Sequence, residues 1–161
     1  TISVRGNIAT RIKKLHENDF DGLIIAKAAM ERLNLSFENT YEFSYEEMLP
    51  AASQGFIGIE CISSNKDLIK MLDSINSEKD MILAEAERSF VAQLNGSCLS
   101  PIAIYCREES SHVLVSAKAL SQNGDKQIFK EIISSHASIN EDIRSLAKEF
   151  ISKGADKLIL S

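Results

Sequence analysis

The 161-residue chain is long enough for one compact domain or two small ones, and its 44% hydrophobic residues suffice to fill an ordinary core. No apolar run approaches the roughly 20 residues that cross a bilayer, so we expect no membrane partner. The net charge of −5 repels polyphosphate, which argues against nucleic acid as a partner, although a local cluster of arginines can still bind small anions.

The first third of the chain alternates helix and strand patterns, which favours an α/β fold. Apolar residues recur at helical spacing over residues 7–15, and Asn7 is placed to cap the first turn. Residues 23–26 are apolar on both faces, which predicts a strand buried in a largely parallel sheet, and residues 26–35 predict a second helix. Residues 49–61 contain a proline, glycines and another apolar run, which predicts a crossover with a further strand.

The middle of the chain predicts two successive helices. The first covers residues 63–76. The second covers residues 77–96, where Ser77 and Asp80 form a capping-box pattern and Gly96 ends the helix. We therefore expect a domain boundary near residue 76.

The last third predicts a small antiparallel sheet with helices packed against it, as in an α+β fold. Alternating apolar residues predict three strands, at residues 101–106, 112–120 and 126–133. Residues 140–154 carry apolar side chains at helical spacing, capped by Asn140 and stopped by Gly154. A last short extended piece is predicted at residues 156–160.

The histidines and cysteines do not predict a metal centre. The three cysteines are Cys61, Cys98 and Cys106, and their spacings fit no zinc or redox motif. This pattern favours a reducing cytoplasm as the setting of the protein. The histidines lie far apart in polar surroundings and are predicted to be surface residues: His16, His112 and His136. Cys61 and Cys106 lie in apolar runs, where a thiol usually acts as a small hydrophobic side chain of the core.

Two arginines flank the predicted start of the first helix. Arg5 precedes the helix and Arg11 lies one turn inside it, so both guanidinium groups can reach the helix end that favours an anion. A surface arginine without a ligand explains either residue alone equally well, and the helix dipole explains Arg32 at the end of the second helix. Gln54, in a glycine-punctuated turn without nucleotide-loop spacing, can hydrogen-bond a polar ligand.

Cys98 lies in a Gly-Ser-Cys loop between a helix end and a strand that begins with proline. A loop exposes a side chain enough for it to react. No histidine is near in sequence to activate the thiol, so a protease-like dyad has little support. Permanent covalent attachment needs only access and the loss of one proton. The residues alone leave a reactive and a structural role for Cys98 equally open.

Four stretches of the chain, taken in order, resemble one known family. They are RGNIATR (5–11), DGLIIAKAAMERL (21–33), LPAASQGFIGIEC (49–61) and AERSFVAQLNGSCLSPIAIY (86–105). The family is porphobilinogen deaminase, also called hydroxymethylbilane synthase, of tetrapyrrole and heme biosynthesis. The chain departs from it slightly, with Ala29 and Ser53 where the family commonly has glycine. Beyond residue 105 the similarity is confined to the order of strands and helices.

The resemblance implies that Cys98 holds a dipyrromethane cofactor through a thioether. In the family, this primer is extended head to tail by four porphobilinogen units with loss of ammonia, and the linear tetrapyrrole is released by hydrolysis. The implied partners are therefore porphobilinogen and the growing oligopyrrole, whose carboxylates need cations. Four residues match family arginines near this chain of pyrroles: Arg5, Arg11, Arg32 and Arg88. Gln54 and Asn7 match polar family positions.

The resemblance also implies a three-domain α/β enzyme of which these residues are the C-terminal portion. Residues 1–48 are then expected to belong to domain 2, residues 49–75 to return to domain 1 as a crossover, and residues 76–161 to form domain 3 with the cofactor cysteine. The family's aspartate that handles pyrrole N–H protons has no counterpart among these residues. We therefore assign no catalytic residue and expect the chain to be inactive alone. The resemblance implies no metal. We expect the missing N-terminal part of the protein, or a neighbouring copy, to cover its apolar strand faces.

Two other functions fit the residues alone. A non-enzymatic carboxylate-binding or thiol redox module would keep Cys98 as a free thiol. A thiol hydrolase would need a histidine within hydrogen-bonding reach of Cys98.

Overall fold

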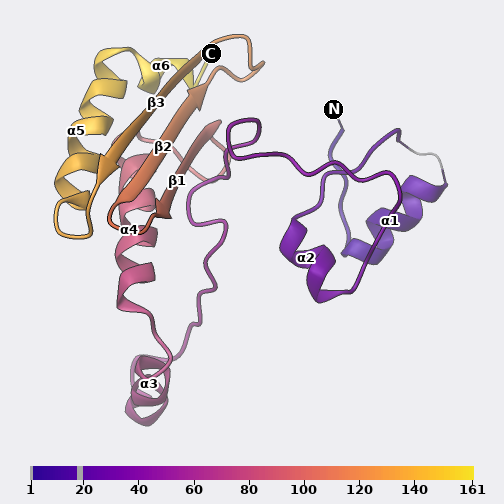
Figure 1. Cartoon of the computed structure of the whole chain (residues 1–161), viewed down its shortest axis with the longest axis horizontal. Helices are drawn as coiled ribbons and strands as arrows, with labels where there is room; N and C mark the ends of the chain where they lie inside the picture. The colour runs from indigo at the N-terminus through magenta and orange to yellow at the C-terminus, as the bar shows by residue number, and fades with distance from the viewer. Residues whose placement is uncertain (1, 18–19) are drawn as a thin grey trace. The chain divides into compact units, whose positions relative to one another are not determined.

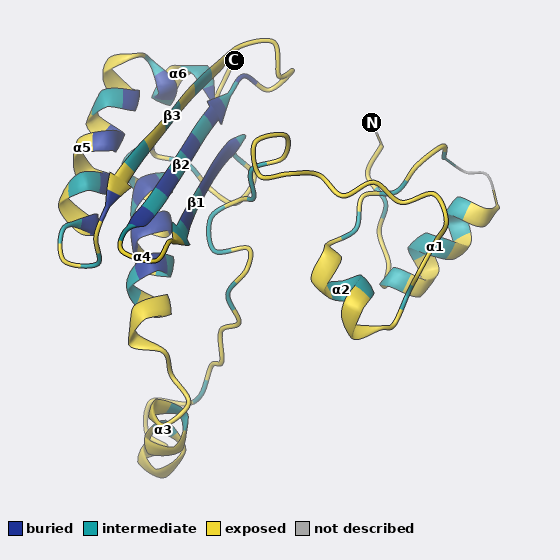
Figure 2. Ribbon diagram, viewed as in Figure 1, coloured by how far each residue is buried: buried dark blue, intermediate teal, exposed yellow. Residues whose placement is uncertain are grey.

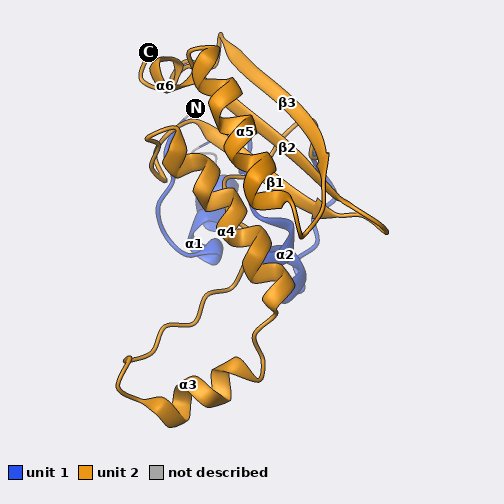
Figure 3. Cartoon of the chain, turned by 90° about the vertical axis from the view of Figure 1, so that its left-hand side faces the viewer, with its two compact units in different colours: residues 1–43 blue, residues 44–161 orange. Residues whose placement is uncertain are grey.

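The computed structural model describes residues 2–17 and 20–161 (Figure 1). The chain divides into two units, residues 1–43 and residues 44–161, each defined by contacts within itself (Figure 3). No helix in the described part of the chain combines the length and apolar character that a membrane crossing requires. The three-part division at residues 48 and 75 stays a prediction.

The first unit contains two helices, α1 (Ile8–His16) and α2 (Lys27–Arg32). Asn7 caps α1, which confirms the prediction. The strand predicted at residues 23–26 is wrong, because these residues have no regular structure and Ile24 is 65% exposed. A strand buried in a parallel sheet needs neighbouring strands on its backbone and cover on both faces, and the described residues of this unit supply no second strand.

The second unit is built on a three-stranded antiparallel sheet in the order β1 (Ile102–Glu108), β2 (Val113–Leu120), β3 (Gln127–Ser134). All three strands lie where the alternating pattern predicts them. In the register, Ile104 pairs with Ala117 and Val115 pairs with Ile132. Because side chains alternate between the two faces, this register gathers the small and branched apolar residues on one face of the sheet.

Two helices, α4 (Glu78–Gln93) and α5 (Ile139–Ser152), cover that apolar face (Figure 1). The rings of Phe90 and Phe150 meet edge to face, with centroids 5.1 Å apart. Figure 2 shows the buried residues gathered where α4 and α5 face the strands. The large side chains of this core that are almost completely buried are Phe90, Leu94, Ile104, Val113, Val115, Ile139, Ile143, Phe150 and Ile159.

Two predicted features near the C-terminus are wrong. Helix α5 begins after Ser138 and not at Asn140, because Ile139 and Ile143 are four residues apart and both face the core. Residues 156–160 are not extended, since helix α6 (Ala155–Leu158) occupies most of them. Gly154, with φ of 83°, turns the chain into α6.

The segment between residue 55 and α4 is largely uncovered. The strand predicted within residues 49–61 does not form, and Ile57 and Ile59 are 77% and 61% exposed. Helix α3 (Lys66–Asp73) forms as predicted, but none of its residues is buried. Residues 55–61 form no strand because a strand needs a neighbour that hydrogen-bonds its backbone. None of the three strands in the described part of the chain pairs with these residues.

Substitution of Phe90 by alanine tests the core. The ring is fully buried against Phe150, so we expect Phe90→Ala to lower the free energy of unfolding by about 3–5 kcal/mol, measured by urea denaturation. Phe129 on β3 is 46% exposed, and Phe129→Ala should cost about 1 kcal/mol or less. Equal losses for the two variants would contradict this account of the core.

Candidate functional site

Cys98 lies in a tight turn that joins α4 to β1. The backbone N–H of Ser97 donates to Ser100 Oγ at 2.9 Å, and the backbone N–H of Ser100 donates to the Ser97 carbonyl at 3.0 Å. These two bonds close the turn around Cys98 and Leu99, both of which are exposed. The turn therefore presents the thiol to solvent on a hydrogen-bonded base.

Gly96 fixes this turn to the core. A Cβ atom at this position would lie 2.4 Å from Ile102 Cδ1 and 3.2 Å from the Val91 carbonyl oxygen, so any side chain here would force Ile102 to move. The preceding Asn95 has φ of 54°, and the backbone N–H of Gly96 donates to the Val91 carbonyl at 3.0 Å. The chain thus leaves α4 by one defined path, and the position of Cys98 follows from it.

The other cysteines have different surroundings. Cys106 on β1 is buried, as predicted, and burial, helped by the charge of Glu87, raises the pKa of its thiol to about 12. Cys61 is only partly buried, which corrects the prediction that it lies in the core. The residues around Cys61 form no strand, so its side chain does not join the apolar face of the sheet. All three cysteines are unpaired.

The start of α1 holds three of the predicted site residues. Asn7 Oδ1 accepts hydrogen bonds from the backbone N–H and the hydroxyl of Thr10, both at 2.8 Å, so its carbonyl is committed to the cap. Arg11 Nε donates to the Gly6 carbonyl at 2.8 Å, which uses one of its five N–H donors. Arg5 is exposed. Both arginines can therefore offer donors to a carboxylate.

The remaining predicted residues lie on the surfaces of their units. Arg32 is exposed in the last turn of α2. Arg88 is exposed on α4, and Gln54 is exposed in a turn at residues 52–55. The predicted residues are thus divided, with Arg5, Asn7, Arg11 and Arg32 in the first unit and Gln54, Arg88 and Cys98 in the second.

Sequence reasoning missed Glu87, which is only 1% exposed. Its Oε2 accepts from the backbone N–H of Ser53 at 2.6 Å, and its Oε1 accepts from the backbone N–H of Cys106 at 2.8 Å. Burial raises the pKa of Glu87, and the two N–H bonds oppose that effect. The signal was present in the sequence, because Glu87 lies four residues after Leu83 and three before Phe90, on the apolar stripe of α4.

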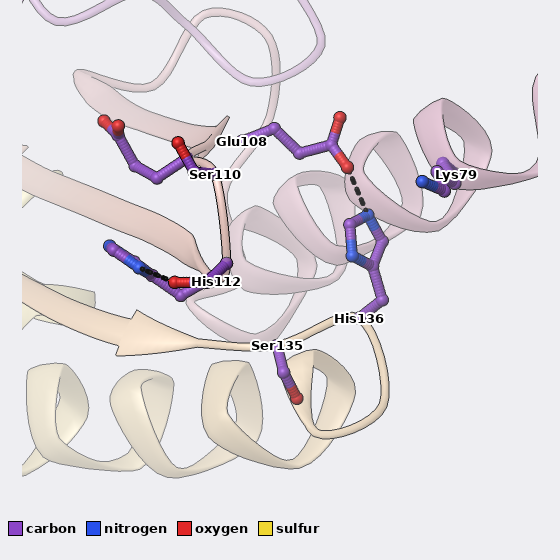
Figure 4. Close-up of a pocket in the computed structure, with 8 residues that line it drawn as sticks. Lys79, Glu108, Ser110, His112, Ser135 and His136 are labelled. Carbon is purple, nitrogen blue, oxygen red and sulfur yellow. Dashed lines mark hydrogen bonds and ion pairs between the residues drawn. The ribbon is translucent and has the colours of Figure 1, made fainter.

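A separate polar pocket of about 210 Å³ lies at one end of the sheet (Figure 4). His136 Nε2 lies 3.2 Å from Glu108 Oε1, an ion-pair distance without hydrogen-bond geometry. His112 and His136 both line this pocket, and each remains partly exposed. The cause is the register, because Val113 pairs with Ser134 and so brings the flanking loops together.

None of the predicted site residues lines this pocket, whose walls are Lys79, Glu108, Glu109, Ser110, Ser111, His112, Ser135 and His136. Within the described residues, no three histidine, cysteine or acidic side chains are grouped as a metal site would need. The pocket has charges of both signs and no geometry that singles out one ligand.

Comparison with known proteins identifies two matching family models. Residues 1–70 match the model described as porphobilinogen deaminase, dipyromethane cofactor binding domain. Residues 81–152 match the model described as porphobilinogen deaminase, C-terminal domain. Among the predicted site residues, Arg88 and Cys98 fall within the second match and the others within the first.

The chain is similar to porphobilinogen deaminases of Campylobacter. The porphobilinogen deaminase of Campylobacter hominis is 41% identical over 160 residues, which cover 98% of this chain and 52% of the relative. Those of Campylobacter jejuni strain 81-176 and Campylobacter concisus are 40% and 36% identical with the same coverage. The chain therefore spans about half the length of the curated relatives it matches.

Alkylation of the native chain tests the difference between the cysteines. Because Cys98 is exposed while Cys106 is buried with a raised pKa, we expect iodoacetamide at neutral pH to modify Cys98 and to leave Cys106 intact. Peptide mass spectrometry identifies the modified residues, and the same reaction in denaturant, where all three should react, is the control. Modification of Cys106 as fast as Cys98 in the native chain would contradict the structure.

Proposed function

The chain belongs to the porphobilinogen deaminase family, and from this premise we propose that it forms part of a hydroxymethylbilane synthase. Such a transferase joins four porphobilinogen units head to tail with loss of ammonia. In this proposal the chain holds the dipyrromethane primer and binds the carboxylates of the growing oligopyrrole. Three unpaired cysteines support a cytoplasmic setting for it.

The observation that carries the proposal is the exposed thiol of Cys98 in its hydrogen-bonded turn. A thioether needs only an accessible sulfur that can lose its proton, and Cys98 alone among the three cysteines is exposed. The turn is held by Ser97 and Ser100, so an attached group would start from a defined point. The residues present therefore fit a covalently held cofactor.

The arginines supply the charge that such a cofactor requires. Each pyrrole carries an acetate and a propionate, so a chain of pyrroles gathers negative charge as it grows. When bound, the dipyrromethane supplies the free pyrrole carbon to which substrate is added. We propose that four guanidinium groups bind its carboxylates in pairs of hydrogen bonds: those of Arg5, Arg32 and Arg88, which are exposed, and that of Arg11, which is half-buried.

The two amide residues have different proposed roles. Gln54 is exposed, so both ends of its amide are available to pyrrole N–H groups or carboxylates. The carbonyl of Asn7 is used by the α1 cap, which leaves its NH₂ group as the donor to a ligand. Asn7 also keeps the first turn of α1 formed, and this turn positions Arg11.

A second candidate is supported by the same exposed thiol. A thiol redox or carboxylate-binding module would also present Cys98 and the arginines to solvent. The two functions differ in the bond that sulfur forms, since a reductant cleaves a disulfide and leaves a thioether intact. A thiol hydrolase has less support, because the pocket lined by His112 and His136 does not include Cys98.

Intact-mass measurement tests cofactor attachment. The chain is incubated with porphobilinogen and with a polypeptide that supplies the half of the relatives it does not span. We expect the 161-residue chain to gain the mass of two linked pyrroles, resistant to dithiothreitol, and expect Cys98→Ser to gain none. Cys61→Ser is the matched control and should gain the same mass as the unchanged protein. A gain on Cys98→Ser, or a gain that dithiothreitol removes, would refute the thioether proposal.

We further propose that a partner polypeptide covers the uncovered segment of the second unit. Ile57, Ile59, Met71 and Ile75 are each more than half exposed, and such a run of large apolar side chains favours an interface. The part of the relatives that this chain does not span, or another copy of the chain, would bury them. The residues that handle the pyrrole N–H protons are proposed to come from that partner.

An activity assay tests the need for the partner. We expect the purified 161-residue chain to form no hydroxymethylbilane from porphobilinogen, because no proton-handling aspartate is assigned in it. Addition of the complementary polypeptide should restore product, and Ile57→Asp together with Ile59→Asp should weaken this restoration by placing charges in the interface. Turnover by the chain alone at the rate of the mixture would overturn the partner proposal.

A further inference from the structure

Glu87 is a buried carboxylate that joins two distant parts of the second unit. It lies on the apolar stripe of α4 beside Leu83 and Phe90, where an unpaired acid would be costly. Each of its oxygens accepts one backbone N–H, from Ser53 at 2.6 Å and from Cys106 at 2.8 Å. The first bond spans 34 residues of sequence and the second spans 19.

The two donors belong to the edge of the sheet and to the segment that covers it. β1 is an outer strand, so every second backbone N–H along it points away from β2. The N–H of Ile104 donates to the Pro50 carbonyl at 3.2 Å, and the N–H of Cys106 donates to Glu87. Pro50 and Glu87 thus accept the hydrogen bonds of the N–H groups at the free edge of β1.

Further contacts hold residues 50–56 in place. Ser53 Oγ donates to the Ala84 carbonyl on α4 at 3.3 Å, and Ala52 and Phe56 pack against the core. Ser53 has φ of 60°, a left-handed conformation that non-glycine residues rarely adopt. The Glu87 bond falls on the N–H of this same residue, so it stabilises the turn at its most strained point.

We propose that Glu87 is a positioning residue that fixes residues 50–56, and with them Gln54, to the domain that carries Cys98. Ser53 and Glu87 are bonded, so their chain neighbours Gln54 and Arg88 each lie one residue from that bond. The same helix leads on to the turn of Cys98. The docking of the segment stands on geometry alone, whereas the consequence for Gln54 rests on the proposed function.

The chemistry requires a carboxylate here. Two N–H donors meet two acceptor oxygens, and glutamine would present one oxygen and one NH₂ group to the same pair. One backbone N–H would then be left without an acceptor in a buried place, which is the costly outcome. Aspartate keeps both acceptor oxygens, but its side chain is one methylene shorter, so the oxygens lie farther from the two N–H donors.

Amide hydrogen exchange of the 161-residue chain tests the docking. In Glu87→Gln we expect exchange of the amides at residues 51–56, which follow Pro50, to accelerate about tenfold or more, while the amides of β2 and β3 keep their rates. Glu87→Asp keeps the carboxylate and disturbs the fold less, so it should give a smaller acceleration in the same residues. Glu85→Gln is the matched control, since Glu85 is exposed on the same helix, and it should leave every rate unchanged.

Two results would overturn the proposal. Unchanged exchange over residues 51–56 in both Glu87 variants would show that the bond does not hold the segment. Equal acceleration over β2, β3 and residues 51–56 would show that Glu87 supports the whole core and does not position this segment in particular.

A double-mutant cycle on pyrrole attachment at Cys98, followed by intact mass, tests the consequence for Gln54. If Glu87 acts through Gln54, Glu87→Gln should slow attachment in the unchanged chain and have no further effect when Gln54 is already alanine. Fully additive effects would overturn this consequence. Absence of attachment in the unchanged protein would refute the proposed function and leave the docking result standing.

Discussion

The packing of α4 onto the three-stranded sheet determines where the candidate residues of the second unit lie. Phe90 is held against Phe150 with ring centroids 5.1 Å apart, and Leu83 and Ala86 are buried on the same side of the helix. Once this stripe is buried, the neighbouring Arg88 is left in solvent. The chain that leaves α4 must also pass Ile102 at Gly96, where a Cβ atom would lie 2.4 Å from Ile102 Cδ1. The exposure of Cys98 is thus a consequence of core packing.

Electrostatics complement this packing in two ways. The chain carries a net charge of −5, so the exposed arginines are local exceptions on an acidic protein. Guanidinium groups can bind carboxylates, and the role proposed for these arginines rests on that chemistry. Glu87 shows the opposite case, because a negative charge inside the core is tolerated only where backbone N–H groups compensate for lost water.

Local sequence patterns predicted the elements that pack within one compact unit. Strands β1 to β3 alternate apolar and polar residues and pair with neighbours close in sequence, so their pattern was sufficient. The apolar runs at residues 23–26 and 55–61 follow similar composition but form no strands, because pairing depends on a partner strand that the described residues do not supply. Residues 156–158 are helical and not extended because Ala155 and Ile159, four residues apart, are both buried in the core.

The sequence by itself determined the character of the cysteine turn and the caps of α1 and α4, because Gly96, Ser97, Asn7 and Ser77 act through contacts within a few residues. It also determined the family, through motifs that keep their order along the chain. Only the tertiary structure decided that Glu87 binds Ser53 and Cys106, and that His112 and His136 share a pocket. Those contacts join residues far apart in sequence, and they exist only after burial of the core has brought the segments together.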